Sequence, residues 1–500
     1  TASIVLAVMI LPTIAAISRE SLRAVPRIHR ESALGLGATR WEATRLAVLG
    51  PARRGILGAA MLGLGRALGE TIAVTMVIGN RYALPTSLFS PAQTIASLIV
   101  NELGQAAPLE VSALVEIGLL LLLISLAVNS FARLLIWTLT GSERGGSRSF
   151  FLRRWAHRIT GGGPAAGVTP RTGPPRSVEP AFTGASGSIG PRRERIRGWL
   201  VRRAPRRRRT QWLVVGLTLG LFVLAILPLA TIVETAISNG GAAVIHPSFY
   251  TSELPVGCNP FAGNATTPAR SCPLGGIGPA IEGTLILVGL ASIIAVPAGL
   301  FAGIYLSEYG RGRFSRLVSF LTEVMTGIPS ILIGLFVYVV VFTSDRDLVN
   351  TGLAGAAALS ILMIPIVTRS TEEALRLVPP GLREAGLGLG FPRHRVTLRI
   401  VLGCASSAIV TGTLLAVARA AGETAALVLT AGTSNYWFQG WNSPVAAMAP
   451  YIYTYFQTTY ANWQEDAWGA ALVLLGIMLV VSLAARLAFR PRTAGAEGDG

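Results

Sequence analysis

Long apolar runs separated by short polar connections dominate the 500-residue chain. Each run is about as long as the roughly 20 apolar residues that an α-helix needs to cross a bilayer. The pattern therefore predicts an all-α polytopic membrane protein with nine spans. These are expected at residues 1–18, 54–79, 111–140, 212–236, 280–306, 317–343, 352–371, 404–431 and 467–489.

The short connections alternate between two kinds along the chain. Segments 19–53, 307–316, 372–403 and 486–492 are rich in arginine, whereas segments 80–110, 237–279, 344–351 and 432–466 hold one arginine each or none. Because cytoplasmic loops carry the excess of basic residues, the first set is predicted to be cytoplasmic. Cys258 and Cys272 then share an outer loop, where a disulfide between them is permitted.

Residues 141–211 have a different composition from the rest of the chain. They are rich in Gly, Pro and Ser and hold 17 arginines against three glutamates. Such a segment cannot bury a core, so it is expected to be a disordered cytoplasmic linker. We interpret its charge as a contact with anionic lipid headgroups rather than with nucleic acid.

Composition sharpens the class of protein. Hydrophobic residues make up 51% of the chain and charged residues 14%, whereas soluble domains average about 25% charged. The net charge of +18 comes entirely from arginine, because the chain contains no lysine. A phosphate-binding G-x-x-x-x-G-K-[ST] loop is therefore impossible, and no metal site or resident cofactor is predicted.

An internal repeat organises the sequence. Residues 12–79 match residues 365–432 at a constant offset of 353 without gaps, with 27 of 68 positions identical. The second copy starts near Gln211 and has six predicted spans, so the first copy would begin before Thr1, and three of its spans are missing from this sequence. We expect two parallel six-span units related by a pseudo-two-fold axis normal to the membrane, with a pathway between them. The predicted parts are residues 1–140 (first unit), 141–211 (linker), 212–490 (second unit) and 491–500 (tail).

The longest cytoplasmic loop of each copy carries one motif, ESALGLGATRWEATRLAVLGP at 31–51 and EAGLGLGFPRHRVTLRIVLG at 384–403. The pattern predicts a short helix followed by a glycine at which the chain turns. The motif resembles the EAA loop of ABC importer permeases, with glycine where that family often has proline, and the resemblance implies that the helix docks on a separate ATPase. The alternative is an ordinary amphipathic surface loop. The matching positions are Glu31, Ala33 and Gly37 in the first copy and Glu384, Ala385 and Gly390 in the second.

A charged pair lies within a predicted span of each copy, in GRALGET (65–71) and ARAAGET (418–424). An arginine at the centre of a membrane helix costs at least about 2.5 kcal/mol. One interpretation is an ion pair between arginine and the glutamate four residues later that fixes helix packing. The other is that both pairs line the pathway, where guanidinium groups bind an oxyanion. The residues are Arg66, Glu70 and Thr71, and Arg419, Glu423 and Thr424.

With GIPS at 327–330, these motifs resemble the permease subunits of phosphate-specific ABC importers. Residues 1–140 are similar to the C-terminal half of a PstC-type subunit, and residues 211–490 to a whole PstA-type subunit. The resemblance implies the type I ABC permease fold, a bacterial cell membrane location, phosphate as substrate, two ABC ATPase subunits that bind ATP and Mg, and an extracytoplasmic phosphate-binding protein. It also implies that Arg66, Glu70, Arg419 and Glu423 serve transport. The alternatives are a permease for sulfate or molybdate, and an anion transporter that needs no ATPase.

Overall fold

A computed structural model describes residues 2–83, 86–87, 89–140, 190–254, 275–344, 348–458 and 460–488 of the chain. The described part is almost entirely helical, with an isolated β-bridge between Gly79 and Ala92. Three short π-helical turns, η1, η4 and η6, interrupt the α-helices. The first copy of the repeat holds α1 (Ala2–Arg23), α2 (Arg27–Gly35), α3 (Arg40–Ala43), η1 (Thr44–Val48), α4 (Leu49–Gly69), α5 (Ile72–Ile78), α6 (Ile95–Glu102) and α7 (Pro108–Thr140).

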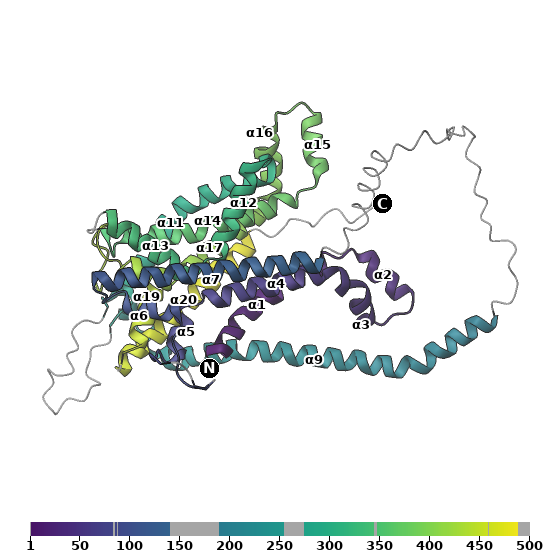
Figure 1. The fold of residues 1–500 in the computed structure, drawn as a ribbon, viewed down its shortest axis with the longest axis horizontal. Coiled ribbons are helices and arrows are strands. Elements are labelled where there is room, and N and C mark those ends of the chain that lie inside the picture. Colours follow the sequence, from purple (N-terminus) through teal and green to yellow (C-terminus); the bar gives the residue numbers. More distant parts are fainter. Residues whose placement is uncertain are drawn as a thin grey trace, which may run out of the picture. The chain divides into compact units, whose positions relative to one another are not determined.

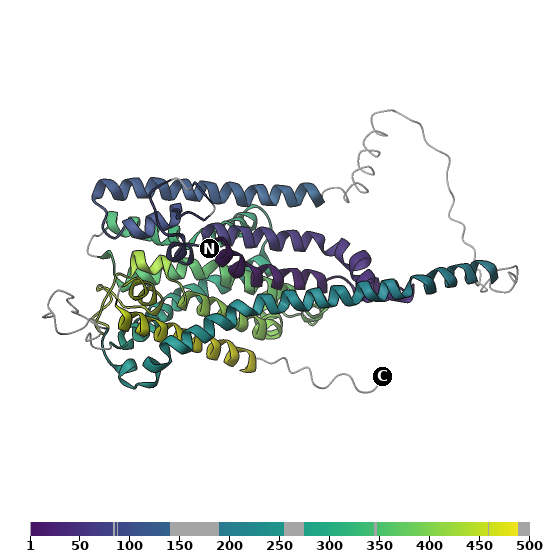
Figure 2. The same ribbon diagram turned by 90° about the horizontal axis from the view of Figure 1, so that it is seen from below.

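The remaining helices begin with the longest one in the described chain, α9 (Gly190–Ile245). The others are α10 (Ser248–Thr251), α11 (Gly278–Ile304), η4 (Tyr305–Tyr309), α12 (Arg313–Gly327), α13 (Ser330–Ser344), α14 (Gly352–Arg376), α15 (Pro380–Gly388), α16 (Arg393–Arg395), η6 (Val396–Val401), α17 (Leu402–Ala421), α18 (Ala425–Thr430), α19 (Met448–Phe456) and α20 (Ala461–Ala488). Figures 1 and 2 show these helices from two directions.

The nine predicted spans all correspond to helices. Seven helices of the described chain are long and apolar enough to cross a membrane, and two bent helix pairs raise the number to nine. One bent pair is α4 with α5. The other is α12 with α13, and these two helices turn by 106° at their junction. The prediction of an all-α polytopic protein is therefore confirmed. Three of the predicted spans, 54–79, 317–343 and 404–431, are interrupted, because each of these runs contains a helix break.

The linker also differs from its prediction. Residues 190–211 are the helical start of α9 rather than a disordered segment. Arginine is a good helix former, and extending a helix from an existing transmembrane segment needs no new nucleus. Residues 141–189 lie outside the described part of the chain, as do the tail at 491–500 and the loop with Cys258 and Cys272.

The described chain divides into two compact units. One unit comprises residues 1–13, 62–130 and 227–500, and the other comprises residues 14–61 and 131–226. The smaller unit holds α2, α3 and η1, which contact one another. The larger unit holds every helix from α10 to α20, together with α5 and α6.

In the larger unit α14 is the central helix and packs against α11 and α17 (Figures 1 and 2). Gly299 and Gly303 of α11 allow the closest part of this contact. A Cβ atom at Gly299 would lie 2.7 Å from Cβ of Val367, and one at Gly303 would lie 2.6 Å from Cβ of Thr371. Small residues four apart let two helix backbones approach closely in this way. The two helices therefore meet almost backbone to backbone.

One apolar cluster joins the two copies of the repeat within the larger unit. Ile99 of α6 is fully buried there beside Ile331 of α13 and Leu429 of α18. The phenolic hydroxyl of Tyr453, on α19, donates a hydrogen bond of 3.3 Å to Oδ1 of Asn101. Segments more than 300 residues apart in the sequence therefore share a core.

The 353-residue offset persists in the structure well beyond the matched sequence. Helices α2 and α15 begin and end 353 residues apart, and α6 and α19 begin at the same offset. The amide of Ala92 donates to the carbonyl of Ile78 at 3.0 Å, and the amide of Val445 donates to the carbonyl of Ala431 at the same distance. The repeated backbone thus includes the segment after the conserved motifs, where few residues are identical.

Candidate functional site

The two GET motifs lie at helix breaks rather than inside continuous helices. α4 ends at Gly69 and α5 begins at Ile72; α17 ends at Ala421 and α18 begins at Ala425. In each copy the glutamate and threonine occupy the break. The predicted pathway residues are therefore placed at matching interruptions of two membrane helices.

Each glutamate lies beside the start of the helix that follows it. The carboxylate of Glu70 interacts with the backbone N–H of Ala73, and that of Glu423 interacts with the N–H of Ala426. The first N–H groups of a helix have no partner within it, and a negative charge is favourable there. The side chain of Thr71 makes no cap and instead donates to the carbonyl of Gly69 at 3.3 Å. The glutamate therefore explains why the chain restarts as a helix so soon after the break.

A third break separates α12 from α13. Ile328 is extended, with φ −76° and ψ 132°, and Pro329 follows it. Proline lacks an N–H donor and disfavours the helical conformation of the residue before it, so both effects end α12 here. The carbonyl of Gly327 accepts a hydrogen bond of 3.1 Å from the hydroxyl of Ser125, on α7.

The three breaks adjoin one another. A Cβ atom at Gly69 would lie 3.1 Å from Cα of Pro329, so the end of α4 lies against the proline break. Ser330, the first residue of α13, donates its hydroxyl to the carboxylate of Glu423. All of these residues belong to the larger unit. The ends of six helices consequently meet in one region that holds the four predicted charges.

The four charges act on one another across the two copies of the repeat. Glu70 experiences the charges of both Arg66 and Arg419, and Arg419 experiences those of Arg66, Glu70 and Glu423. The guanidinium of Arg66 also donates to the hydroxyl of Thr13, on α1, at 3.2 Å. The structure thus brings together residues that are 353 positions apart in the sequence.

Among the described residues, neither motif forms an ion pair between its arginine and its glutamate. Neither Arg66 with Glu70 nor Arg419 with Glu423 lies within the 4.0 Å of an ion pair. The i, i+4 spacing places two side chains on one face only while the helix continues, and here it ends between them. Both arginine side chains are exposed. Their guanidinium groups therefore keep donors for another oxyanion.

A short helix lies at the predicted docking position of each copy, and each is called a docking helix below. α2 contains Glu31 and Ala33, and α15 contains Glu384 and Ala385. The glycine that follows each helix, Gly37 or Gly390, has a positive φ, +84° or +81°. Only glycine adopts this conformation without steric cost, which accounts for its place in the motif.

Each docking helix is followed by an exposed apolar residue. Leu36 after α2 is 86% exposed, and Leu389 after α15 is 76% exposed. Glu31, Glu384 and Ala385 are exposed as well. An exposed apolar surface beside charges is typical of a protein–protein contact.

Comparison with known proteins decides the family. Residues 295–492 match the family described as the inner membrane component of binding-protein-dependent transport systems. The phosphate transport system permease protein PstA of Yersinia pestis is 39% identical over 224 residues, which cover 45% of this chain and 75% of that protein. PstA of Haemophilus influenzae is 40% identical over 226 residues, covering 45% and 79%. PstA 1 of Mycobacterium tuberculosis (strain CDC 1551) is 36% identical over 267 residues, covering 53% and 84%.

This chain belongs to the PstA family of ABC transporter permeases. It is a multi-pass membrane protein and a transport component. Permeases of this kind work with an ATPase and with a substrate-binding protein.

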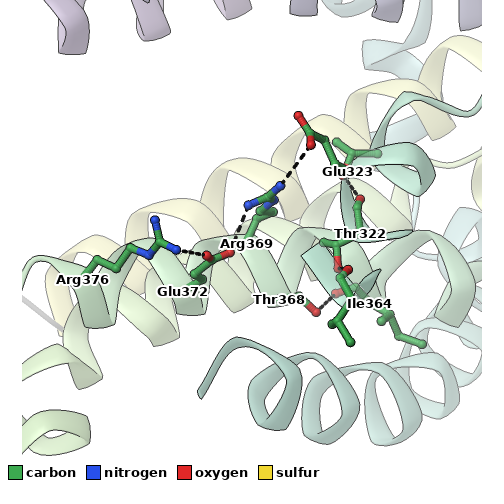
Figure 3. Close-up of polar contacts among 9 residues, drawn as sticks. Thr322, Glu323, Ile364, Thr368, Arg369, Glu372 and Arg376 are labelled. Atoms are coloured by element: carbon green, nitrogen blue, oxygen red, sulfur yellow. Dashed lines mark hydrogen bonds and ion pairs between the residues drawn. The ribbon is translucent and has the colours of Figure 1, made fainter. Parts of the chain in front are cut away.

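The permease carries a second group of charges that the sequence did not single out. On α14, Glu372 is buried and pairs with Arg369 at 3.0 Å and with Arg376 at 2.6 Å (Figure 3). Arg369 also approaches Glu323 of α12 at 3.8 Å. These ion pairs connect α14 to α12, the helix that ends just before Pro329. Its signal in the sequence was an arginine three residues before a glutamate at the end of an apolar run.

A further ion pair of the permease was also missed. The guanidinium of Arg383, on docking helix α15, lies 2.7 Å from a carboxylate oxygen of Glu308, in η4. The two residues are 75 positions apart, and both occur in arginine-rich connections. Nothing in the local pattern distinguishes them from exposed charges, so only the tertiary structure could reveal the pair.

Proposed function

We propose that the protein is the permease of an ATP-driven importer of inorganic phosphate. The names of its relatives, which are phosphate transport permeases, support this substrate. The meeting of Arg66, Arg419, Glu70 and Glu423 at adjoining helix breaks is the observation that carries the proposal. Phosphate is a compact tetrahedral anion that guanidinium groups bind through paired hydrogen bonds.

In this proposal one arginine from each copy of the repeat binds the phosphate. The glutamates hold the short helices α5 and α18 in place by interacting with backbone N–H groups at their starts and limit the excess positive charge at the site. The hydroxyls of Thr71 and Thr424 add hydrogen-bond donors. A site of balanced charge releases an anion more readily than two unopposed arginines would.

The proposal also assigns the parts of the chain and their partners. Residues 1–140 act as the C-terminal half of a PstC-type unit, and residues 212–490 act as the complete PstA-type unit. Two ABC ATPase subunits bind ATP and Mg and dock on α2 and α15, and a phosphate-binding protein delivers the substrate from outside. The linker and the C-terminal tail lie in the cytoplasm. ATP-driven movement of the docking helices opens the site to each side in turn.

The test is phosphate uptake into proteoliposomes that contain the full-length transporter with its ATPase and binding protein. The variant Arg66→Ala combined with Arg419→Ala is expected to reduce uptake at least about a hundredfold, as expected when charged hydrogen bonds to a bound anion are lost. Arg311→Ala is the matched control. Arg311 is exposed, and within the described residues it has no hydrogen bond or ion pair.

Uptake close to the wild-type value in the double variant would refute the site. Sulfate or molybdate competing with phosphate at equal concentration would indicate a different oxyanion. Uptake that needs no ATP would indicate a transporter independent of an ATPase.

A further inference from the structure

Arg383 uses its whole guanidinium group to join three elements. Nε donates to both carboxylate oxygens of Glu308, at 3.1 and 3.2 Å, and Nη2 donates to Oε1 at 2.7 Å. Nη2 also donates to the carbonyl of Leu375 at 2.7 Å, and Nη1 donates to that of Val378 at 2.6 Å. The side chains of Arg383 and Glu308 are only 23% and 10% exposed.

These contacts lie at the end of α14. Leu375 belongs to the last turn of α14, and its carbonyl also accepts a hydrogen bond of 3.2 Å from the amide of Val378. A guanidinium that donates to carbonyls at the C-terminus of a helix is favoured by the helix dipole. Glu308 lies in η4, which directly follows α11, so Arg383 attaches docking helix α15 to the ends of both α11 and α14.

An apolar contact supports the same attachment. Gly386 of α15 is buried, and a Cβ atom there would lie 2.9 Å from Cδ1 of Ile400 and 3.0 Å from Cγ2 of Val396. Val396 and Leu375 belong to one buried cluster that also includes Ile304, the last residue of α11. One side of α15 is thus fixed to the helical bundle, while Glu384 and Ala385 on the other side are exposed.

We propose that Arg383 is a positioning residue that transmits movement of docking helix α15 to α11 and α14. The inference rests on the proposed function, in which an ATPase moves this helix. A short helix joined to its neighbours by loops alone could shift without moving them. Because the five hydrogen bonds of Arg383 link α15 to the ends of α11 and α14, a displacement of α15 also displaces these helix ends.

The experiment uses the full transporter in proteoliposomes and measures phosphate transported per ATP hydrolysed. The variant Arg383→Gln is expected to leave assembly with the ATPase intact, because Glu384 and Ala385 remain. The ratio of transport to hydrolysis is expected to fall by about tenfold, within the usual range of coupling between two sites. Arg311→Gln is the matched control, since it removes the same charge from the same cytoplasmic face and is expected to leave the ratio unchanged.

Glu308→Gln provides the second variant, because it keeps the carbonyl contacts of Arg383 and loses only the carboxylate charge. Its ratio is expected to fall less than that of Arg383→Gln, and Arg383→Lys should recover part of the loss. An unchanged ratio in both Arg383→Gln and Glu308→Gln would overturn the inference. Failure of the wild-type complex to bind an ATPase or to take up phosphate would instead refute the proposed function.

Discussion

The two docking helices have the same backbone but different surroundings. α2 and α15 each span nine residues and are followed by a glycine of positive φ two residues after the helix. On α15, Arg383 makes five hydrogen bonds, whereas its counterpart Arg30 on α2 is exposed and has no ion pair or hydrogen bond with a described residue. The residues equivalent to Leu375 and Val378 are Leu22 and Val25, and Arg30 donates a hydrogen bond to neither. A repeated backbone does not by itself require repeated contacts.

Side-chain volume around the two helices differs. The second copy has Gly386 facing Val396 and Ile400, and the corresponding residues of the first copy are Ala33, Ala43 and Ala47. Large neighbours therefore accompany the glycine, and small residues accompany the alanine. Because Gly386 has large neighbours at contact distance, a larger side chain there has less room than one at Ala33.

The largest effect that tests this comparison is expected for Gly386→Val. The new side chain would overlap Ile400 and Val396, and overpacking of this kind costs about 1–3 kcal/mol. The thermal unfolding midpoint of the purified protein in detergent should fall. Adding Ile400→Ala should restore part of it, while Ala33→Val in the first copy should have a smaller effect. Equal shifts at positions 386 and 33 would mean that the two helices are packed alike.

An equal effect in the two copies is expected for Gly37→Ala and Gly390→Ala. A Cβ atom at either position would meet no atom within 4 Å, so only the positive φ opposes the substitution. The left-handed conformation costs about 1–2 kcal/mol for a residue with a Cβ atom. Both variants should lower the unfolding midpoint by similar amounts.

Gly388→Ala is the control for this pair, because Gly388 is helical and also has open space around it. Since alanine favours a helix, the midpoint should stay the same or rise. A fall of the same size in all three variants would show that the positive φ is not responsible.

The smallest effect is expected for Thr13→Val, which removes the hydroxyl that accepts a hydrogen bond from Arg66. The second copy has Ile366 at the equivalent position, so Arg419 already lacks this partner. A single hydrogen bond contributes about 1 kcal/mol, so the phosphate concentration for half-maximal uptake should change less than about fivefold. A larger change would mean that Thr13 itself contacts the substrate and that the two copies bind it unequally.

The spans and the two short helices α2 and α15 could be predicted because their signals are local. Apolar length gives a span, and a glycine two residues beyond a short helix gives its turn, as at Gly37 and Gly390. The helix breaks at Glu70 and Glu423 could not be predicted from apolar length, because a break changes the hydrophobicity of a run very little. In hindsight the order Gly, Glu, Thr within an apolar run is a helix-end and helix-start signal.

The convergence of the two arginines was suggested by the repeat, but their lack of ion pairs was not. Whether each arginine pairs with its glutamate depends on where the helix ends and on which backbone N–H groups of the next helix attract the glutamate. The contacts of Arg369 with Glu323 and of Arg383 with Glu308 join residues of separate elements. The amino-acid sequence alone does not indicate which residues of separate elements lie close together.

The glycine contact between α11 and α14 has a mechanical consequence. Two rods joined along their length resist bending more than the same rods acting separately, because bending would require them to slide past each other. With Gly299 and Gly303 against Val367 and Thr371, little room exists for such sliding. A force applied at the ends of these helices next to α15 should therefore tilt the pair as a rigid lever, and its far end would travel farthest.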